Sequence, residues 1–382
     1  MNGPSRLNPS ETRRYARHLV LPEVGLAGQL RLKEASVLIV GVGGLGAPAA
    51  LYLAAAGVGR LGLVDFDAVD LGNLQRQVLY TTGDVGRAKV DAARERLTGL
   101  NPEIAITTFP VRITAGNALD ILRGFDVVLD GSDNFPTRYL VNDACALGGL
   151  PYVYGSVYRF EGQASVFWKG RGPCYRCLHP SPPQRGEVPN CAEGGVLGVV
   201  PGVIGSIQAA ETLKILLDSG TPLIGRLLLY DALTATFRTM TLARDPACAL
   251  CGDHPTITTL SGLDDACAAP EPPAREQTPH VTVAELHARC ARGDRPFLLD
   301  VRTPEEWAIC RLDGARLIPL QTLPAHLVEL DKNAEIVVYC HVGARSAMAA
   351  AFLRREGFAR ARNLVGGVAA WAAEIDPAMP RY

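Results

Sequence analysis

The stretch Ser36-Val-Leu-Ile-Val-Gly-Val-Gly-Gly-Leu-Gly46 decides the fold of this chain. A short β-branched run ends in closely spaced glycines, and the alanine-rich segment 47–56 that follows has the composition of a helix. Strand, glycine turn and helix in this order predict a nucleotide site at the carboxyl end of a buried parallel strand. Glycines let the backbone approach phosphate oxygens, and free amides at a helix start attract negative charge. Alone, the glycine pattern also fits a nicotinamide or flavin enzyme.

Acidic residues follow two of the strands that come next. Segment 60–65 is a predicted strand ending in Asp65, the position where a doubly wound fold holds a ribose. Segment 126–130 is a predicted buried strand, followed by Asp133, Asn134 and a helix expected at 139–147. Further strands are predicted at 104–111, 152–157, 162–168, 226–232 and 236–242, and a long helix at 196–217. The fold class is therefore α/β, a Rossmann-like domain with a parallel-rich sheet.

Length and composition limit the classes of protein to consider. The 382 residues suffice for two or three domains, and a net charge of −1 with 48% hydrophobic residues argues against nucleic-acid or membrane-surface partners. Segment 36–59 is uncharged and long enough to span a membrane, but its six glycines and Pro48 favour strand, turn and helix. The polar N-terminal residues lack the pattern of a signal peptide, so we expect a cytoplasmic protein.

A change of composition marks a second domain. Ala, Pro and Glu crowd together without periodicity towards residue 279, which predicts a linker at 266–279 between a domain at 1–265 and a smaller α/β domain at 280–382. In the smaller domain we expect helices at 282–292 and 344–356 and strands at 297–301 and 336–339.

One polar set points to triphosphate chemistry. Asp65, Asn73, Arg76, Lys89 and Asp133 surround the glycine turn in sequence, and cations with carboxylates are the groups that clamp a triphosphate and hold Mg²⁺. A dinucleotide-dependent dehydrogenase does not need such cations. The alternative is that these are solvated charges on a helix and a loop.

The cysteines fall into recognisable groups. Cys174-x-x-Cys177 and Cys248-x-x-Cys251 are two knuckles whose four thiolates suit a tetrahedral structural Zn²⁺ site; four buried apolar cysteines are the alternative. Cys191 stands alone in a loop before the long helix. Cys340 lies directly between a strand and a helix, where turn amides and Arg345 suit an anionic sulfur able to carry a persulfide; a packing cysteine is the alternative.

Taken together, these segments resemble the MoeB/ThiF branch of E1-like activating enzymes, and the C-terminal region is similar to a single rhodanese domain. The first resemblance rests on Gly41-Val-Gly-Gly-Leu-Gly46, Val64-Asp65-Phe-Asp67, Gly72-Asn-Leu-Gln-Arg76, Lys89, Gly131-Ser-Asp133-Asn134, Pro189-Asn-Cys191 and both knuckles. The second rests on Asp300-Val-Arg-Thr-Pro-Glu-Glu-Trp307, the Cys340 loop and Asn363-Leu-Val-Gly-Gly-Val-Ala-Ala-Trp371. The combination resembles the fused adenylyltransferase–sulfurtransferase (MoeZ/MOCS3/Uba4) type.

The resemblance implies a function. ATP would activate the C-terminal glycine of a ubiquitin-like sulfur carrier of the MoaD or ThiS kind, and a persulfide on Cys340 would convert the acyl-adenylate into a thiocarboxylate for molybdenum cofactor, thiamine or a related product. Cys191 would sit where a thioester or acyl disulfide forms. A cysteine desulfurase or thiosulfate would supply the sulfur. Arg17 would reach into the site of a neighbouring subunit, which implies a homodimer.

The resemblance also implies roles for individual residues. Asp65 would bind the ribose and Asp133 would hold Mg²⁺, while Arg76, Asp133, Cys191, Cys340 and Arg345 would take part in catalysis. The nucleotide-binding residues implied are Arg17, Gly41, Gly43, Gly44, Asp65, Asp67, Gly72, Asn73, Leu74, Gln75, Arg76, Lys89, Asp133 and Asn134.

Two positions depart from the family pattern. Gly72 stands where a serine is usual, so that a phosphate-side hydroxyl is missing, and Cys310-Arg-Leu-Asp-Gly replaces the usual Gly-His-Ile-x-Gly of rhodaneses. The sequence leaves two other functions open. One is a dinucleotide-dependent oxidoreductase, but Arg76, Lys89 and the knuckles argue against it. The other is a non-catalytic carrier-binding scaffold, but a scaffold would not need Asp133 or Cys340.

Overall fold

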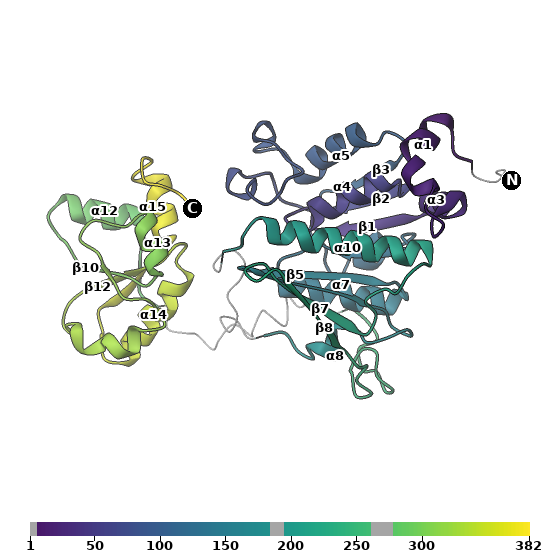
Figure 1. Ribbon diagram of the computed structural model, residues 1–382. Coiled ribbons are helices and arrows are strands. Elements are labelled where there is room, and N and C mark those ends of the chain that lie inside the picture. Colours follow the sequence, from purple (N-terminus) through teal and green to yellow (C-terminus); the bar gives the residue numbers. More distant parts are fainter. Residues whose placement is uncertain (1–5, 184–194, 261–277) are drawn as a thin grey trace. The chain divides into compact units, whose positions relative to one another are not determined.

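The computed structural model describes residues 6–183, 195–260 and 278–382. The chain divides into two compact units, Met1–Ala269 and Pro270–Tyr382, and each contains its own sheet (Figure 1). The linker predicted at 266–279 lies outside the described residues except for its last two positions.

The first unit is built on an eight-stranded sheet of order β3-β2-β1-β4-β5-β6-β7-β8. Its strands are β1 (Ser36–Val40), β2 (Arg60–Val64), β3 (Ala105–Phe109), β4 (Val127–Asp130), β5 (Tyr152–Tyr158), β6 (Glu161–Phe167), β7 (Arg226–Asp231) and β8 (Thr236–Thr241). The first five are parallel and the last three antiparallel. Because β1 pairs with β2 on one side and β4 on the other, the order of strands reverses there, which opens a crevice at their carboxyl ends.

Helices cover both faces of this sheet. The helices are α1 (Pro9–Arg14), α2 (Ala16–Leu19), α3 (Gly25–Glu34), α4 (Gly46–Ala56), α5 (Lys89–Leu100), α6 (Ala118–Leu122), α7 (Phe135–Gly148), α8 (Tyr175–Leu178) and α10 (Val199–Leu217), with 3₁₀ turns η1 (Leu71–Asn73) and η2 (Thr82–Asp84). One hydrophobic core joins β1 to α4, α5 and α10, and a second joins the opposite face of β1 to α6 and α7. Strand β1 is buried along its whole length, which explains its unbroken apolar sequence.

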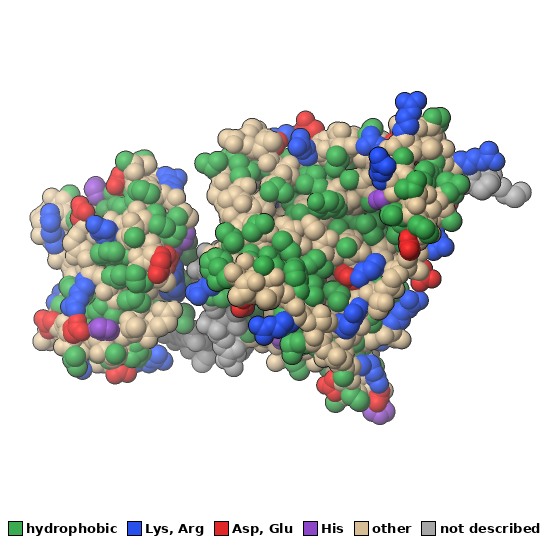
Figure 2. All heavy atoms as spheres, in the orientation of Figure 1, with side chains coloured by type: hydrophobic (Ala, Val, Ile, Leu, Met, Phe, Trp, Pro, Cys, Tyr) green, Lys and Arg blue, Asp and Glu red, His purple; other side chains and the backbone are tan. Residues whose placement is uncertain are grey.

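The long apolar segments resolve into core elements. Segment 36–59 forms β1, a turn and the helix α4, as predicted. Among the described residues, α10 is the one helix long and apolar enough to cross a membrane by length and composition. It packs against α4, β5 and β6, and Figure 2 shows hydrophobic side chains gathered over its outer side. Val199, Val203, Ile207 and Phe237 of β8 line a shallow groove there.

Helix α7 begins four residues before the predicted start at Tyr139. Asn134 has an extended backbone and its side chain accepts a hydrogen bond from the Thr137 amide at 3.0 Å, which makes it the N-cap. The proline after Phe135 suits the first turn of a helix because it needs no amide donor there. The hydrophobic period alone did not reveal this first turn, in which Thr137 and Arg138 follow Phe135 and the proline.

The second unit has a five-stranded parallel sheet of order β11-β10-β12-β13-β9. Its elements are β9 (His280–Val281), α12 (Val283–Ala291), β10 (Phe297–Asp300), α13 (Pro304–Ile309), β11 (Arg316–Leu317), η3 (Leu323–Glu329), β12 (Ile336–Tyr339), α14 (Ala344–Arg355), β13 (Ala361–Leu364) and α15 (Gly367–Glu374). Hydrophobic clusters on both faces of the sheet form its core. Cys310 is buried in one of them, so the departure from the usual glycine is accommodated by packing.

Candidate functional site

The glycine turn lies where β1 ends and α4 begins. Gly41 has φ +84°, and a Cβ there would meet the backbone of Gly131 after β4 at 2.9 Å, so glycine is needed for both conformation and space. The turn is held by two side chains: the Val42 amide donates to Asp65 Oδ2 at 2.9 Å, and the Tyr80 hydroxyl donates to the Val42 carbonyl at 2.8 Å. Side chains from two other segments therefore hold the backbone of the glycine turn in place.

Two carboxylates follow β2 at the edge of the turn. Asp65 Oδ1 also accepts from the Asp67 amide at 2.9 Å, and burial, opposed by Lys89, raises the pKa of Asp65. Lys89, at the start of α5, is almost fully buried and pairs with Asp67 Oδ2 at 2.9 Å. Each carboxylate oxygen of Asp65 has accepting capacity left for a ribose hydroxyl.

Arg76 reaches the glycine turn from the segment that follows the 3₁₀ turn η1. Its guanidinium donates to the Asn73 side chain at 2.8 Å and to the Gly72 carbonyl at 3.3 Å. A Cβ on Gly44 would lie 3.6 Å from Arg76 Cδ, so this side chain passes directly over the turn. The residue at position 72 thus contributes its backbone carbonyl, which a glycine supplies as well as a serine.

A single cleft gathers most of the predicted nucleotide-binding residues. Those that line it are Gly41, Gly43, Gly44, Asp65, Asp67, Arg76, Lys89, Asp133 and Asn134. Gly72 and Asn73 instead accept hydrogen bonds from the Arg76 guanidinium. Leu74 packs against the core of the first unit. The backbone of Gln75 packs closely against Gly198 at the start of α10.

Four further cleft-lining residues were missed in the sequence. Gln77, Ser132 and Arg138 are buried in its wall, and in the described structure Gln77 Oε1, Ser132 Oγ and Arg138 Nε have no hydrogen-bond partner. Arg112 lies over the Phe66 ring at 3.9 Å on the far side. Buried polar atoms without partners are costly, so their convergence on one cleft indicates a polar ligand. The sequence signal was available for Ser132, which lies inside the quoted motif Gly131-Ser-Asp133-Asn134. It was not available for Gln77 and Arg112, which come from loops, or for Arg138, which comes from α7.

Asp133 and Asn134 have different environments although they are neighbours. The Asn134 oxygen caps α7, whereas Asp133 is exposed to the cleft. Beneath them, Asp130 at the end of β4 is fully buried, where it accepts from the Ser132 amide at 2.8 Å and the Tyr152 hydroxyl at 2.5 Å. Burial, opposed by Arg138, raises the pKa of Asp130.

Arg17 lies at the far end of the domain from this cleft. It is exposed on α2, next to His18, whose ring contacts Gln29 at 2.9 Å, and Gln29 in turn donates to the Ala56 carbonyl at the last turn of α4. The glycine turn is at the first turn of α4, and the eleven residues between the two ends of that helix span about 16 Å. Within one chain, the structure does not bring Arg17 to the cleft.

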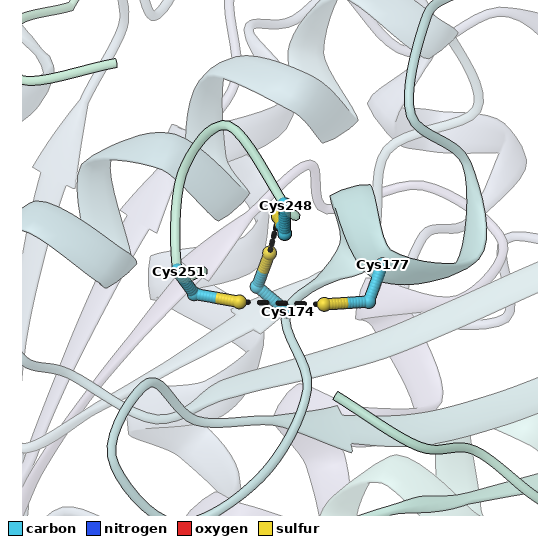
Figure 3. Close-up of side chains that lie close together, drawn as sticks. All are labelled: Cys174, Cys177, Cys248 and Cys251. Atoms are coloured by element: carbon cyan, nitrogen blue, oxygen red, sulfur yellow. Dashed lines mark hydrogen bonds between the residues drawn. The ribbon is translucent and has the colours of Figure 1, made fainter. Parts of the chain in front are cut away.

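The two knuckles meet in space, as Figure 3 shows. All four sulfurs lie within 4.8 Å of one another, with Cys174 and Cys248 3.6 Å apart and Cys177 and Cys251 3.3 Å apart. Four thiolates around Zn²⁺ at about 2.3 Å from each sulfur would lie about 3.8 Å apart, so the set fits the metal. Burial and the neighbouring thiol of Cys177 raise the pKa of Cys251 to about 12, which a bound cation would reverse.

In the second unit, Cys340 follows β12 directly and its side chain is buried. The Gly343 amide and the Ser346 hydroxyl donate to its sulfur at 3.1 and 3.3 Å, as the predicted anion-stabilising turn requires. Arg345 forms a bidentate ion pair with Glu306 of α13, with both distances 2.7 Å, so its charge is balanced within the domain. Cys191 lies outside the described residues.

Comparisons with known proteins agree with both halves of this description. Residues 15–250 match the model of the ThiF family, and residues 282–374 match the rhodanese-like domain. The chain is 46% identical to the probable adenylyltransferase/sulfurtransferase MoeZ of Mycobacterium tuberculosis, over 99% of this chain and 97% of that protein. It is 42% identical to the adenylyltransferase and sulfurtransferase MOCS3 of Aedes aegypti, over 99% and 90%.

Two further similarities concern the first unit. The chain is 55% identical to a sulfur carrier protein adenylyltransferase of Thermus thermophilus, over 69% of this chain and 98% of that one. The structure resembles that of E. coli MccB with ATP at a TM-score of 0.54 and 25% identity, over 64% of this chain and 75% of that one.

Proposed function

Since the chain belongs to the ThiF family and carries a rhodanese-like domain, we propose that it adenylylates the C-terminal glycine of a ubiquitin-like sulfur carrier and then transfers sulfur to it. Relatives similar over the whole chain are named for both activities, and these names set aside the oxidoreductase and scaffold alternatives. The observation that carries the proposal is the convergence of the glycine turn, Arg76, Lys89 and Asp133 on one cleft.

The first half-reaction needs two anions to meet. The carrier carboxylate attacks the α-phosphorus of ATP, and pyrophosphate leaves. Arg76 and Lys89, both placed before the substrate arrives, would offset the repulsion and the charge of the leaving group. Asp65 would accept from the ribose hydroxyls. The exposed carboxylate of Asp133 would hold Mg²⁺, which supplies charge neutralisation at the phosphates when bound.

The second half-reaction moves sulfur. The terminal sulfur of a Cys340 persulfide attacks the acyl carbon, AMP leaves, and an acyl disulfide between Cys340 and the carrier remains. A second thiol, for which Cys191 is our candidate, then attacks the Cys340 sulfur: the carrier departs as a thiocarboxylate, and a new disulfide forms between the two cysteines. A thiol reductant would reduce that disulfide before the next turnover. The amide and hydroxyl that face Cys340 Sγ would stabilise the thiolate at both stages. A cysteine desulfurase or thiosulfate would load the sulfur.

Further parts of the proposal concern assembly. Cys174, Cys177, Cys248 and Cys251 would hold a structural Zn²⁺, which suits a reducing compartment such as the cytoplasm. A homodimer would let Arg17 of one chain complete the cleft of its partner, and the apolar groove along α10 offers a surface for such an interface.

The test is intact-mass spectrometry of a Gly-Gly-ended carrier protein incubated with this enzyme, ATP, Mg²⁺ and thiosulfate. We expect the carrier to gain about 16 Da as sulfur replaces oxygen, and this gain to be absent with Cys340→Ala. An adenylated carrier without the gain would support activation but exclude the sulfur donor used. If neither species forms with any carrier tested, the proposal is wrong.

A further inference from the structure

One aromatic ring lies on the residue that follows the rhodanese cysteine. The ring of Tyr382 stacks on that of His341, with centroids 4.4 Å apart and planes 13° from parallel. His341 is adjacent to Cys340, and its carbonyl accepts from the Ala369 amide at 3.0 Å in the first turn of α15. The backbone of the histidine is thus fixed by α15, and its side chain is covered by Tyr382.

The hydroxyl of Tyr382 is fixed from two sides. Arg302 Nη1 donates to it at 2.7 Å, and the hydroxyl lies 3.1 Å from Glu306 Oε1, to which it donates. Arg302 is fully buried and held by a short ion pair with Asp300 at the end of β10, with 2.6 Å between Nη2 and Oδ2. These contacts anchor the tyrosine to the core of the domain.

Glu306 links this anchor to the cysteine turn. The same carboxylate makes the bidentate ion pair with Arg345, in the first turn of α14. Burial opposes its ionisation, but Arg345 and the Thr303 amide outweigh that effect and lower the pKa of Glu306 to about 2. The carboxylate is therefore charged at neutral pH and holds Tyr382 and Arg345 together.

The covering ring has an electrostatic consequence for His341. Burial lowers the pKa of His341 and outweighs the opposite effects of Glu306 from α13 and of a hydrogen bond to the Tyr382 backbone, while Arg345 from α14 and Arg302 after β10 lower it further. While the imidazole is neutral, it adds no charge beside Cys340, and the sulfur is stabilised by the hydrogen bonds from the Gly343 amide and the Ser346 hydroxyl. An uncovered, protonated ring would add a positive charge next to it.

We propose that Tyr382 is a positioning residue of the sulfurtransferase site, which covers His341 with its ring and, through its hydroxyl, joins the core arginine to the Glu306–Arg345 pair. It touches no reacting atom itself. The proposal rests on the rhodanese half of the proposed function and is independent of adenylylation.

The test compares Tyr382→Ala and Tyr382→Phe with the wild type in the full chain. Two quantities are followed: the His341 pKa by NMR, with His341→Gln to assign the signal, and the pH profile of Cys340 alkylation by iodoacetamide, followed at its peptide by mass spectrometry. Removing the ring should raise the His341 pKa towards its ordinary value. At pH 6, alkylation should become about three- to ten-fold faster, because a neighbouring cation favours the thiolate.

The phenylalanine variant separates the two parts of the side chain. It keeps a ring for stacking but loses both hydroxyl contacts, so the His341 pKa should lie between those of wild type and Tyr382→Ala. His287 offers the control, since its ring packs against that of Trp371 in α15 with the ring centroids 5.8 Å apart. The variant His287→Ala should leave the His341 pKa and the alkylation profile of Cys340 unchanged. The proposal is overturned if, in either folded Tyr382 variant, the His341 pKa and the rate of Cys340 alkylation equal those of the wild type. If Tyr382→Ala does not fold, Tyr382→Phe alone decides.

Discussion

Arg76 is held in place before any substrate arrives. Its guanidinium donates to Asn73 and Gly72, and its aliphatic part passes over Gly44. A planar guanidinium with five N–H groups can keep such contacts and still present further N–H groups to a phosphate, whereas an ammonium group has three N–H groups on one nitrogen and cannot match that geometry. The position is therefore sensitive to the shape of the cation as well as to its charge.

We predict that Arg76→Lys lowers the rate of carrier-dependent ATP–pyrophosphate exchange about 100-fold, the loss typical of one preorganised charge contact in a transition state. The overall fold should be unaffected, since Arg76 is only partly buried. Arg94→Lys is the matched control, because Arg94 is half exposed on α5 and pairs with Asp91 away from the glycine turn. If Arg76→Lys exchanges pyrophosphate at the wild-type rate, the guanidinium of Arg76 takes no part in adenylylation and the prediction is wrong.

At the scale of elements, α7 connects the cleft to the cysteine knuckles. Its first turns supply Arg138 to the cleft wall, and its later residues bind α8. There Asp143 accepts two hydrogen bonds from Arg176 at 2.8 and 2.7 Å, and the Asn142 side chain accepts from the Tyr175 amide at 2.8 Å. Because α8 lies inside the first knuckle, the cysteine cluster also helps to place α7.

We predict that the purified protein contains one zinc ion per chain and that Cys248→Ser loses it. Without the metal, the remaining cysteines no longer join segments 174–177 and 248–251, and the melting temperature of the first unit should fall by about 10 °C or more. Metal analysis and thermal unfolding measure the two effects. The control is Cys290→Ser, a partly buried cysteine of the second unit that should keep the zinc. The prediction is wrong if the purified wild type contains no zinc and Cys248→Ser melts at the same temperature as the wild type.

At the scale of the whole molecule, the position of Arg17 bears on assembly. It lies near the end of α4 that is opposite the glycine turn, so it can act on a nucleotide only in another chain. A symmetric dimer in which each chain supplies Arg17 to the other would contain two composite sites.

This arrangement predicts complementation between two inactive variants. Arg17→Ala and Lys89→Met should each lose pyrophosphate exchange when purified alone. A hybrid dimer, co-expressed with two different tags, contains one site with both wild-type residues and should recover about half of the wild-type activity. A hybrid as inactive as its parents would place both residues in the same chain's site and exclude the shared arrangement.

Several features of the fold and site were predictable from local sequence alone. The strand, glycine turn and helix at 36–56 follow from residue period and glycine conformation, and Asp65, Arg76 and Lys89 lie in segments next to that turn. The cysteine knuckles were predictable because two C-x-x-C units have few other uses. The start of α7 was not, since it depends on the polar cap Asn134 and on a proline in the first turn, and neither contributes to a hydrophobic period.

Other features were decided only by the tertiary structure. Gln77 meets Ser132 and Arg138 in one wall because two separate segments converge at the switch in strand order, and no spacing in the sequence encodes that convergence. The same holds for Tyr382, which contacts His341 and Arg302 from 41 and 80 residues away. Sequence determined which chemistry this protein has available, because that depends on residue types and local turns. The fold decided which side chains share a site, because that depends on packing between distant segments.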